Sequence, residues 1–134
     1  KIQSQSTSNP SSISQAAAVE ALNGTQSFIK KRAKSFSDRR NFVVNYLNSI
    51  PGITCLMPKG AFYVFPSCKG LIGKKTKIKN DTDFVQKLLE KQNVAVVQGS
   101  AFGLDGYFRI SYATSMQKLK VAMVRIKLFC ESLG

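Results

Sequence analysis

Histidine is absent from the 134 residues of the chain, and cysteine is scarce. Without histidine, the chain can perform no histidine acid–base catalysis and offers no histidine metal ligand. The three cysteines, Cys55, Cys68 and Cys130, are an odd number without Cys-x-x-Cys spacing. This pattern argues against a disulfide framework or a zinc site, so we expect inert thiols, no metal and a reducing, cytoplasmic setting.

Long apolar runs are also missing. No stretch approaches the ~20 apolar residues of a transmembrane helix, and the amino end carries no secretory-signal pattern, so we expect no membrane partner. A hydrophobic content of 43% is typical of a globular domain rather than a disordered chain. Because the first residue is Lys1 and not methionine, we expect this chain to be a piece of a longer protein.

Acidic residues are few, with 7 against 20 basic residues and a net charge of +13. Five of the lysines fall in one short stretch: Lys69, Lys74, Lys75, Lys77 and Lys79. One interpretation is a non-enzymatic, basic nucleic-acid-binding module, and the other is a solvated basic loop. No aromatic residues are interleaved with these lysines to stack on bases, so we favour the loop and expect no nucleic-acid partner.

Apolar periodicity and capping residues predict four helices. We expect them at residues 9–24, 25–48, 80–92 and from 115 onwards, after a serine-rich loop over residues 1–8. In the second helix, apolar residues recur at alternating three- and four-residue steps, and Arg40 fills the one gap in this stripe. In the third helix we expect Phe84, Val85, Leu88 and Leu89 to face the core.

Four short strands are expected between and after these helices. Residues 53–57 and 61–65 are typical of a hairpin joined by Pro58-Lys59-Gly60, residues 94–97 of a buried strand, and the residues around Arg109 of the last strand. The element order is helix, helix, strand, strand, helix, strand, strand, helix. It predicts an α+β fold with helices packed on one face of a small sheet, preceded by a long helix.

The last strand, Phe108 to Ala113, contains a single charged residue, Arg109. Strand interiors rarely hold a charge unless it is paired, so Arg109 needs an anionic partner. The partner could be a protein carboxylate, for which Asp38, Asp83 and Asp105 are candidates. It could equally be a ligand carboxylate, because a guanidinium binds a carboxylate through two parallel hydrogen bonds.

A glycine-punctuated segment, Gly99-Ser100-Ala101-Phe102-Gly103, precedes this strand. Its glycines supply backbone angles that other residues avoid and allow close approach of neighbouring atoms. A phosphate-binding loop would need more glycine and a following helix. On spacing alone we therefore interpret the segment as a plain turn.

Three segments resemble the fold type I, pyridoxal-phosphate-dependent aminotransferases of the aspartate aminotransferase class, and they occur in that family's order. They are Gln3 to Pro10, Lys59 to Phe65, and the glycine segment followed by the Arg109 strand. The most similar part is the carboxyl-terminal small domain of the bacterial enzymes. Gln98 departs from the family pattern, which usually has proline at this position.

The resemblance implies a pyridoxal 5'-phosphate enzyme that transfers an amino group from L-aspartate to 2-oxoglutarate. A prephenate, aromatic or alanine aminotransferase of the same class is the alternative. It also implies amino-acid and 2-oxo-acid substrates and a homodimer of the full-length protein. Residues 1–24 would be the tail of the large domain with the first linking helix, and residues 25–134 the small domain with the long interdomain helix.

The same resemblance implies roles for two residues of this chain. Arg109 matches the arginine that binds the substrate α-carboxylate, and Phe62 matches a phenylalanine that borders the substrate pocket. The family's Schiff-base lysine lies in a serine-flanked motif that this chain lacks. We therefore expect no catalytic and no cofactor-binding residue in this piece, and no activity from the piece alone.

Overall fold

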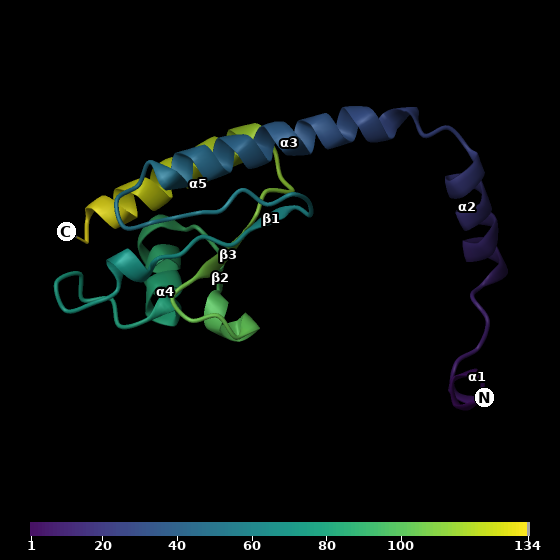
Figure 1. Cartoon of the computed structure of the whole chain (residues 1–134), viewed down its shortest axis with the longest axis horizontal. Helices are drawn as coiled ribbons and strands as arrows, with labels where there is room; N and C mark the ends of the chain where they lie inside the picture. Colours follow the sequence, from purple (N-terminus) through teal and green to yellow (C-terminus); the bar gives the residue numbers. More distant parts are fainter. Residues whose placement is uncertain (134) are drawn as a thin grey trace. The chain divides into compact units, whose positions relative to one another are not determined.

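The computed structural model describes residues 1–133, which divide into two units, Lys1–Ala33 and a second unit that starts at Lys34. The first unit contains α1 (Ile2–Ser6), α2 (Ser12–Asn23) and the beginning of α3 (Ser27–Asn48) (Figure 1). None of its residues is buried. None of the described helices has the length and apolar character needed to cross a membrane.

The short helix α1 corrects the expectation of a loop over residues 1–8. Its hydroxyl groups bond back to carbonyls one turn earlier, so they find their acceptors within the helix: Ser4 donates to the Lys1 carbonyl at 2.9 Å and Thr7 to the Gln3 carbonyl at 2.7 Å. The following helix ends at Gly24 as expected.

The second unit is built on a three-stranded antiparallel sheet in the order β1-β3-β2. Its strands are β1 (Tyr63–Val64), β2 (Val97–Gln98) and β3 (Phe108–Ser111). Tyr63 lies opposite Ser111, and Val97 lies opposite Arg109. Arg109 therefore lies on the central strand, with a neighbour on each side.

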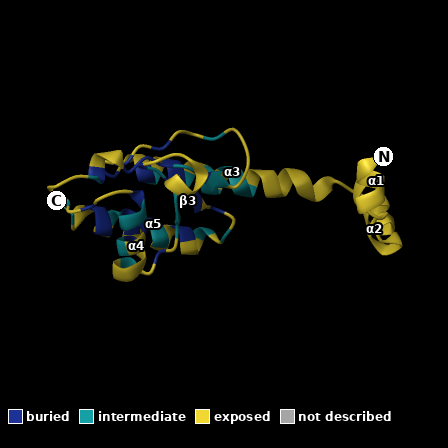
Figure 2. Ribbon diagram, turned by 90° about the horizontal axis from the view of Figure 1, so that it is seen from below, coloured by how far each residue is buried: buried dark blue, intermediate teal, exposed yellow. Residues whose placement is uncertain are grey.

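Helices cover one face of this sheet and confirm the expected α+β fold class. The buried residues of α3, α4 (Asp81–Gln92) and α5 (Met116–Glu131) form one core with Phe108 and Ile110 of β3 (Figure 2). The centre of this core is aromatic, because the Phe84 ring lies 5.0 Å from the Phe108 ring and 5.3 Å from the Phe129 ring. The long helix α3 contributes only its second half, through Val43, Val44 and Leu47.

The expected hairpin over residues 53–65 is wrong. Thr54 forms a bridge with Ser67, which lies beyond the second segment, and β1 pairs with β3 instead. The backbone of Cys55 is satisfied by the Asn48 side chain, which accepts from the Cys55 amide at 2.7 Å and donates to its carbonyl at 2.9 Å. A side chain at the end of α3 thus takes the place of a strand partner.

The strand expected at residues 94–97 is also shorter and shifted, since pairing begins only at Val97. Asn93 ends α4 in the left-handed conformation with φ 53°, and its amide donates to the Leu89 carbonyl at 2.9 Å. Leu89 itself is 49% exposed, so the expectation that it faces the core is wrong.

Replacement of Phe84 tests the aromatic centre of this core. Phe84→Ala removes a side chain that is fully buried between two rings, so we expect urea unfolding to show a loss of about 3–5 kcal/mol. Leu89→Ala on the same helix is the matched control, and it should cost less than about 1 kcal/mol because the side chain is half exposed. Equal losses in the two variants would contradict this description of the core.

Candidate functional site

Arg109 lies on the sheet face that the helices leave uncovered. Along β3, Phe108 and Ile110 are buried whereas Arg109 is half-buried and Ser111 is exposed. Successive side chains of a strand point to opposite faces, so burial of Phe108 and Ile110 directs Arg109 away from the core. The sequence prediction of a charged residue within a strand is therefore met on the open face of the sheet.

Two aromatic rings hold the Arg109 guanidinium. Its Cζ lies 4.5 Å from the centroid of the Tyr63 ring and 4.3 Å from that of the Phe102 ring. Both distances fall within the range of cation–π attraction, which positions a cation without using its hydrogen-bond donors. Sequence reasoning missed this pair of rings, because Tyr63 and Phe102 meet only through strand pairing and the glycine segment.

The carboxylates that could have paired with Arg109 are occupied elsewhere or lie apart from it. Asp38 pairs with Lys34 at 3.5 Å, and Asp83 pairs with Lys87 at 3.0 Å. Asp105 forms no salt bridge within residues 1–133. Within the same residues the guanidinium of Arg109 has neither a carboxylate nor a hydrogen-bond acceptor, so its donors are available to a ligand.

Phe62 stands next to this arrangement. Its side chain is 43% exposed, and its ring centroid lies 4.3 Å from that of Tyr63. The structure thus brings the two sequence-predicted residues, Phe62 and Arg109, into contact with the same tyrosine ring. Two hollows of the second unit, of about 450 and 700 Å³, are lined by other residues. Neither hollow is lined by Arg109 or by the rings around it.

The glycine segment is a 3-10 helix, η2 (Gly99–Phe102), and not the plain turn expected from its spacing. A Cβ at Gly99 would collide with the Leu104 carbonyl oxygen and lie 2.8 Å from the Tyr107 Cβ. Gly103 adopts φ 74°, a conformation that favours glycine. These two constraints turn the chain between η2 and β3 and place Phe102 over Arg109.

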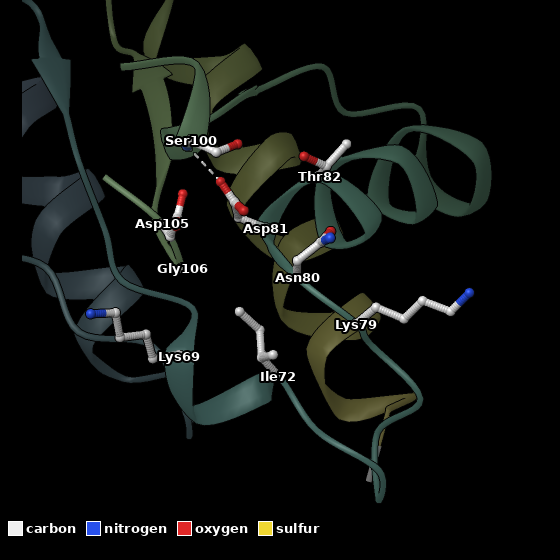
Figure 3. Close-up of a pocket in the computed structure, with 9 residues that line it drawn as sticks. All are labelled: Lys69, Ile72, Lys79, Asn80, Asp81, Thr82, Ser100, Asp105 and Gly106. Atoms are coloured by element: carbon white, nitrogen blue, oxygen red, sulfur yellow. Dashed lines mark hydrogen bonds between the residues drawn. The ribbon is translucent and has the colours of Figure 1, made fainter. Parts of the chain in front are cut away.

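A buried carboxylate fixes the start of η2. Asp81, the first residue of α4, is 3% exposed and accepts a hydrogen bond from the Ser100 amide at 2.7 Å (Figure 3). Burial by itself raises the pKa of this carboxyl, but hydrogen bonds from Ser100 and from the amides of Asp81 and Thr82 outweigh it, so the pKa is lower than usual. Asp81 thereby ties η2 to the helix α4.

The smaller hollow lies beside this contact (Figure 3). Residues of both charge signs line it, Lys69 and Lys79 against Asp81 and Asp105. The lysine-rich stretch itself is mostly loop, with a short 3-10 helix, η1 (Lys69–Leu71), at its start. Its five lysines are exposed.

The thiols and the remaining polar residues offer little chemistry. Burial raises the pKa of Cys55 to about 11, and the pKa values of Cys68 and Cys130 to about 12, so all three remain protonated near neutral pH. Within residues 1–133, no group of three or more histidine, cysteine or acidic residues could hold a metal ion.

The lysines do not fit a covalent cofactor site. An activated lysine is normally desolvated in an apolar pocket or set beside another cation, but here most lysines are exposed. The two half-buried ones are ion-paired, Lys87 with Asp83 at 3.0 Å and Lys127 with Glu131 at 3.8 Å. Among residues 1–133, every lysine is therefore either exposed or ion-paired.

Comparison with known proteins places this arrangement in a family. The family model described as "Aminotransferase class I and II" matches residues 1–126. The chain belongs to this aminotransferase family. The family implies pyridoxal phosphate as cofactor, although the described residues do not themselves fit it.

Individual aminotransferases are closely similar to this chain. The chain is 58% identical to "Aspartate aminotransferase" of Rhizobium meliloti (strain 1021), covering 99% of this chain and 33% of that protein. It is 56% identical to "Probable aspartate/prephenate aminotransferase" of Rickettsia typhi, covering 98% and 34%. The crystal structure of the aspartate aminotransferase from Rhizobium meliloti matches with a TM-score of 0.90 at 58% identity, over 97% of this chain and 34% of that one. The chain thus spans about a third of the length of its curated aminotransferase relatives.

Asp81→Ala tests how this aminotransferase chain holds η2. The pKa of Asp81 in the folded chain is lower than usual. The stability that its charge adds is therefore present above the ordinary aspartate pKa and is lost as the pH falls through the pKa of the folded state. We expect the variant to lose about 1–3 kcal/mol at pH 7 in urea unfolding, and this difference should shrink below a pH of about 4.

Asp105→Ala is the control, because this aspartate is exposed and forms no salt bridge within residues 1–133. A difference between Asp81→Ala and the unchanged chain that stays constant from pH 7 to acid would show that the charge of Asp81 is unimportant.

Proposed function

We propose that this chain is the carboxyl-terminal part of a pyridoxal-phosphate-dependent aminotransferase that transfers the amino group of L-aspartate to 2-oxoglutarate. The names of the Rhizobium relatives support aspartate as the amino donor. The Rickettsia relative's name supports prephenate as an alternative acceptor. The full-length protein acts on amino-acid and 2-oxo-acid substrates as a homodimer in the cytoplasm.

Arg109 is the substrate-binding residue in this proposal. The observation that carries it is a half-buried guanidinium held between two rings, with no carboxylate or hydrogen-bond acceptor among residues 1–133. Such a group can bind the α-carboxylate of an amino acid through two parallel hydrogen bonds. Its catalytic contribution is positional, because the bound carboxylate fixes the direction of the Cα–H bond that must break.

Phe62 borders the substrate in the same proposal. An exposed aromatic ring beside the arginine offers apolar contact to the substrate carbon atoms and helps to exclude water. The open face then becomes one wall of a pocket whose other wall belongs to residues beyond this chain. Those residues also supply the Schiff-base lysine and the phosphate donors, so the 134-residue piece alone is inactive.

Arg109→Ala in the full-length protein tests the assignment. Removal of one partner of a desolvated charge pair should lower kcat/KM for L-aspartate by about 2–5 kcal/mol in transition-state free energy. Arg109→Lys should recover only part of this loss, because an ammonium cannot form the two parallel bonds of a guanidinium. Steady-state transamination with 2-oxoglutarate measures both.

Arg125→Ala is the matched control. Arg125 lies on α5 and donates to the Gln92 carbonyl at 3.2 Å, so its loss should leave kcat/KM nearly unchanged. An Arg109→Ala variant with unchanged kcat/KM would refute the role. Visible absorbance of the full-length protein loaded with pyridoxal phosphate, followed as L-aspartate and then 2-oxoglutarate are added, tests the activity itself. No spectral response to either compound would refute the aminotransferase proposal.

A further inference from the structure

The loop from Pro58 to Phe62, which connects the region after α3 to β1, has an unusual backbone. Ala61 adopts φ 62°, in the left-handed region that residues with a Cβ rarely occupy. The neighbouring Gly60 does not have a positive φ, and a Cβ placed on it would meet nothing within 4 Å. The strained position is thus the alanine next to Phe62 and not the glycine.

Two side chains from distant parts of the sequence hold this loop. The Tyr112 hydroxyl donates to the Ala61 carbonyl at 2.8 Å, and the Tyr112 amide donates to the Phe62 carbonyl at 2.9 Å. At the other end of the loop, Arg40 Nη1 donates to the Pro58 carbonyl at 3.0 Å. Every residue from Lys59 to Phe62 is exposed, so packing alone does not fix the loop.

The two anchors each contact further side chains. Tyr112 is 1% exposed, directly follows β3 and packs near the Phe36 ring of α3 at 6.2 Å. Arg40 is half-buried on α3, and its guanidinium is braced by the Asn41 side chain at 3.0 and 3.2 Å. Arg40 interrupts the apolar stripe of α3 because its side chain hydrogen-bonds to the loop.

The position of the loop is coupled to the arginine through two aromatic rings in contact, those of Phe62 and Tyr63. Phe62 lies 4.3 Å from Tyr63, and Tyr63 lies 4.5 Å from the Arg109 Cζ. A shift of Ala61 and Phe62 therefore displaces a ring that contacts Tyr63, and with it one of the two rings that hold Arg109.

We propose that Tyr112 and Arg40 are positioning residues for substrate binding, which act by clamping the Pro58–Phe62 loop beside Arg109. This inference rests on the proposed function, since it assigns a purpose to the loop at the same site. Neither side chain needs to touch the substrate. Their effect falls on substrate affinity, because they set where Phe62 and the guanidinium stand before the substrate arrives.

Tyr112→Phe in the full-length protein is the sharpest test, because it removes only the hydroxyl and keeps the buried ring. Ala61 is an exposed residue and the buried ring is kept, so the variant should fold normally. We expect KM for L-aspartate and the dissociation constant of maleate, an unreactive dicarboxylate measured by calorimetry, to rise about three- to tenfold. The kcat should change less than KM, and hydrogen exchange should quicken in residues 58–62.

Arg40→Met should act in the same direction, because methionine fills the apolar stripe without reaching Pro58. Arg39→Met is the matched control on the same helix, since Arg39 lies over the Phe36 ring at 5.3 Å and does not bond the loop. Unchanged maleate affinity in both Tyr112→Phe and Arg40→Met would overturn the inference. So would unchanged hydrogen exchange in residues 58–62.

The outcomes also separate this inference from the proposed function. If Arg109→Ala abolishes activity whereas Tyr112→Phe keeps full activity with an unaltered KM, the result overturns the clamp alone. A full-length protein that neither transaminates L-aspartate nor binds maleate would overturn the proposed function and the substrate role of the clamp. Hydrogen exchange would then still report whether the two anchors hold the loop.

Discussion

The alternation of side chains along β3 is the constraint on which the second unit depends. Phe108 and Ile110 must point into the core that α3, α4 and α5 build, so Arg109 must point the other way. Because β3 is the central strand, pairing on both sides fixes its register. A shift by one residue would bury the arginine and expose the phenylalanine, which no local adjustment could offset.

The surroundings of Arg109 are assembled from separate parts of the chain. Pairing of β1 with β3 positions Tyr63, while the glycine segment, tied down by Asp81, positions Phe102. The two rings are held by separate contacts. A strand ladder holds Tyr63, and a buried carboxylate bonded to a backbone amide holds the segment that carries Phe102. The orientation of the arginine is therefore a consequence of the fold and does not need an ion pair to maintain it.

Sequence patterns predicted the elements whose causes are local. The starts of α4 and α5, which Asn80 and Ser115 cap, the apolar face of α4 at Phe84 and Leu88, and the isolated charge on β3 all follow from residues a few positions apart. Patterns failed where a side chain outside the segment decides its conformation. Asn48 satisfies the backbone of Cys55 and prevents a hairpin.

The same limit applies to the candidate site. Arg109 and Phe62 were identified by resemblance to a family, and the structure brings them to one face. The rings that hold the arginine, and the bonds from Tyr112 and Arg40 to the loop, join residues far apart in sequence. Glycine at position 60 suggested the turn residue there, but the left-handed residue is Ala61. Local composition cannot reveal a conformation that tertiary hydrogen bonds impose.

Holding an arginine with rings has a consequence that an ion pair would not have. A carboxylate partner within the protein would neutralise the guanidinium and occupy its donors, so that a substrate carboxylate would first have to displace it. Cation–π contacts leave the charge and the N–H groups in place, while the two rings cover part of the half-buried guanidinium. Less hydration then needs to be removed when a carboxylate binds, and the two parallel hydrogen bonds form in surroundings of lower dielectric constant, where they are stronger. This geometry suits the role proposed for Arg109, in which it binds and releases a carboxylate in every turnover.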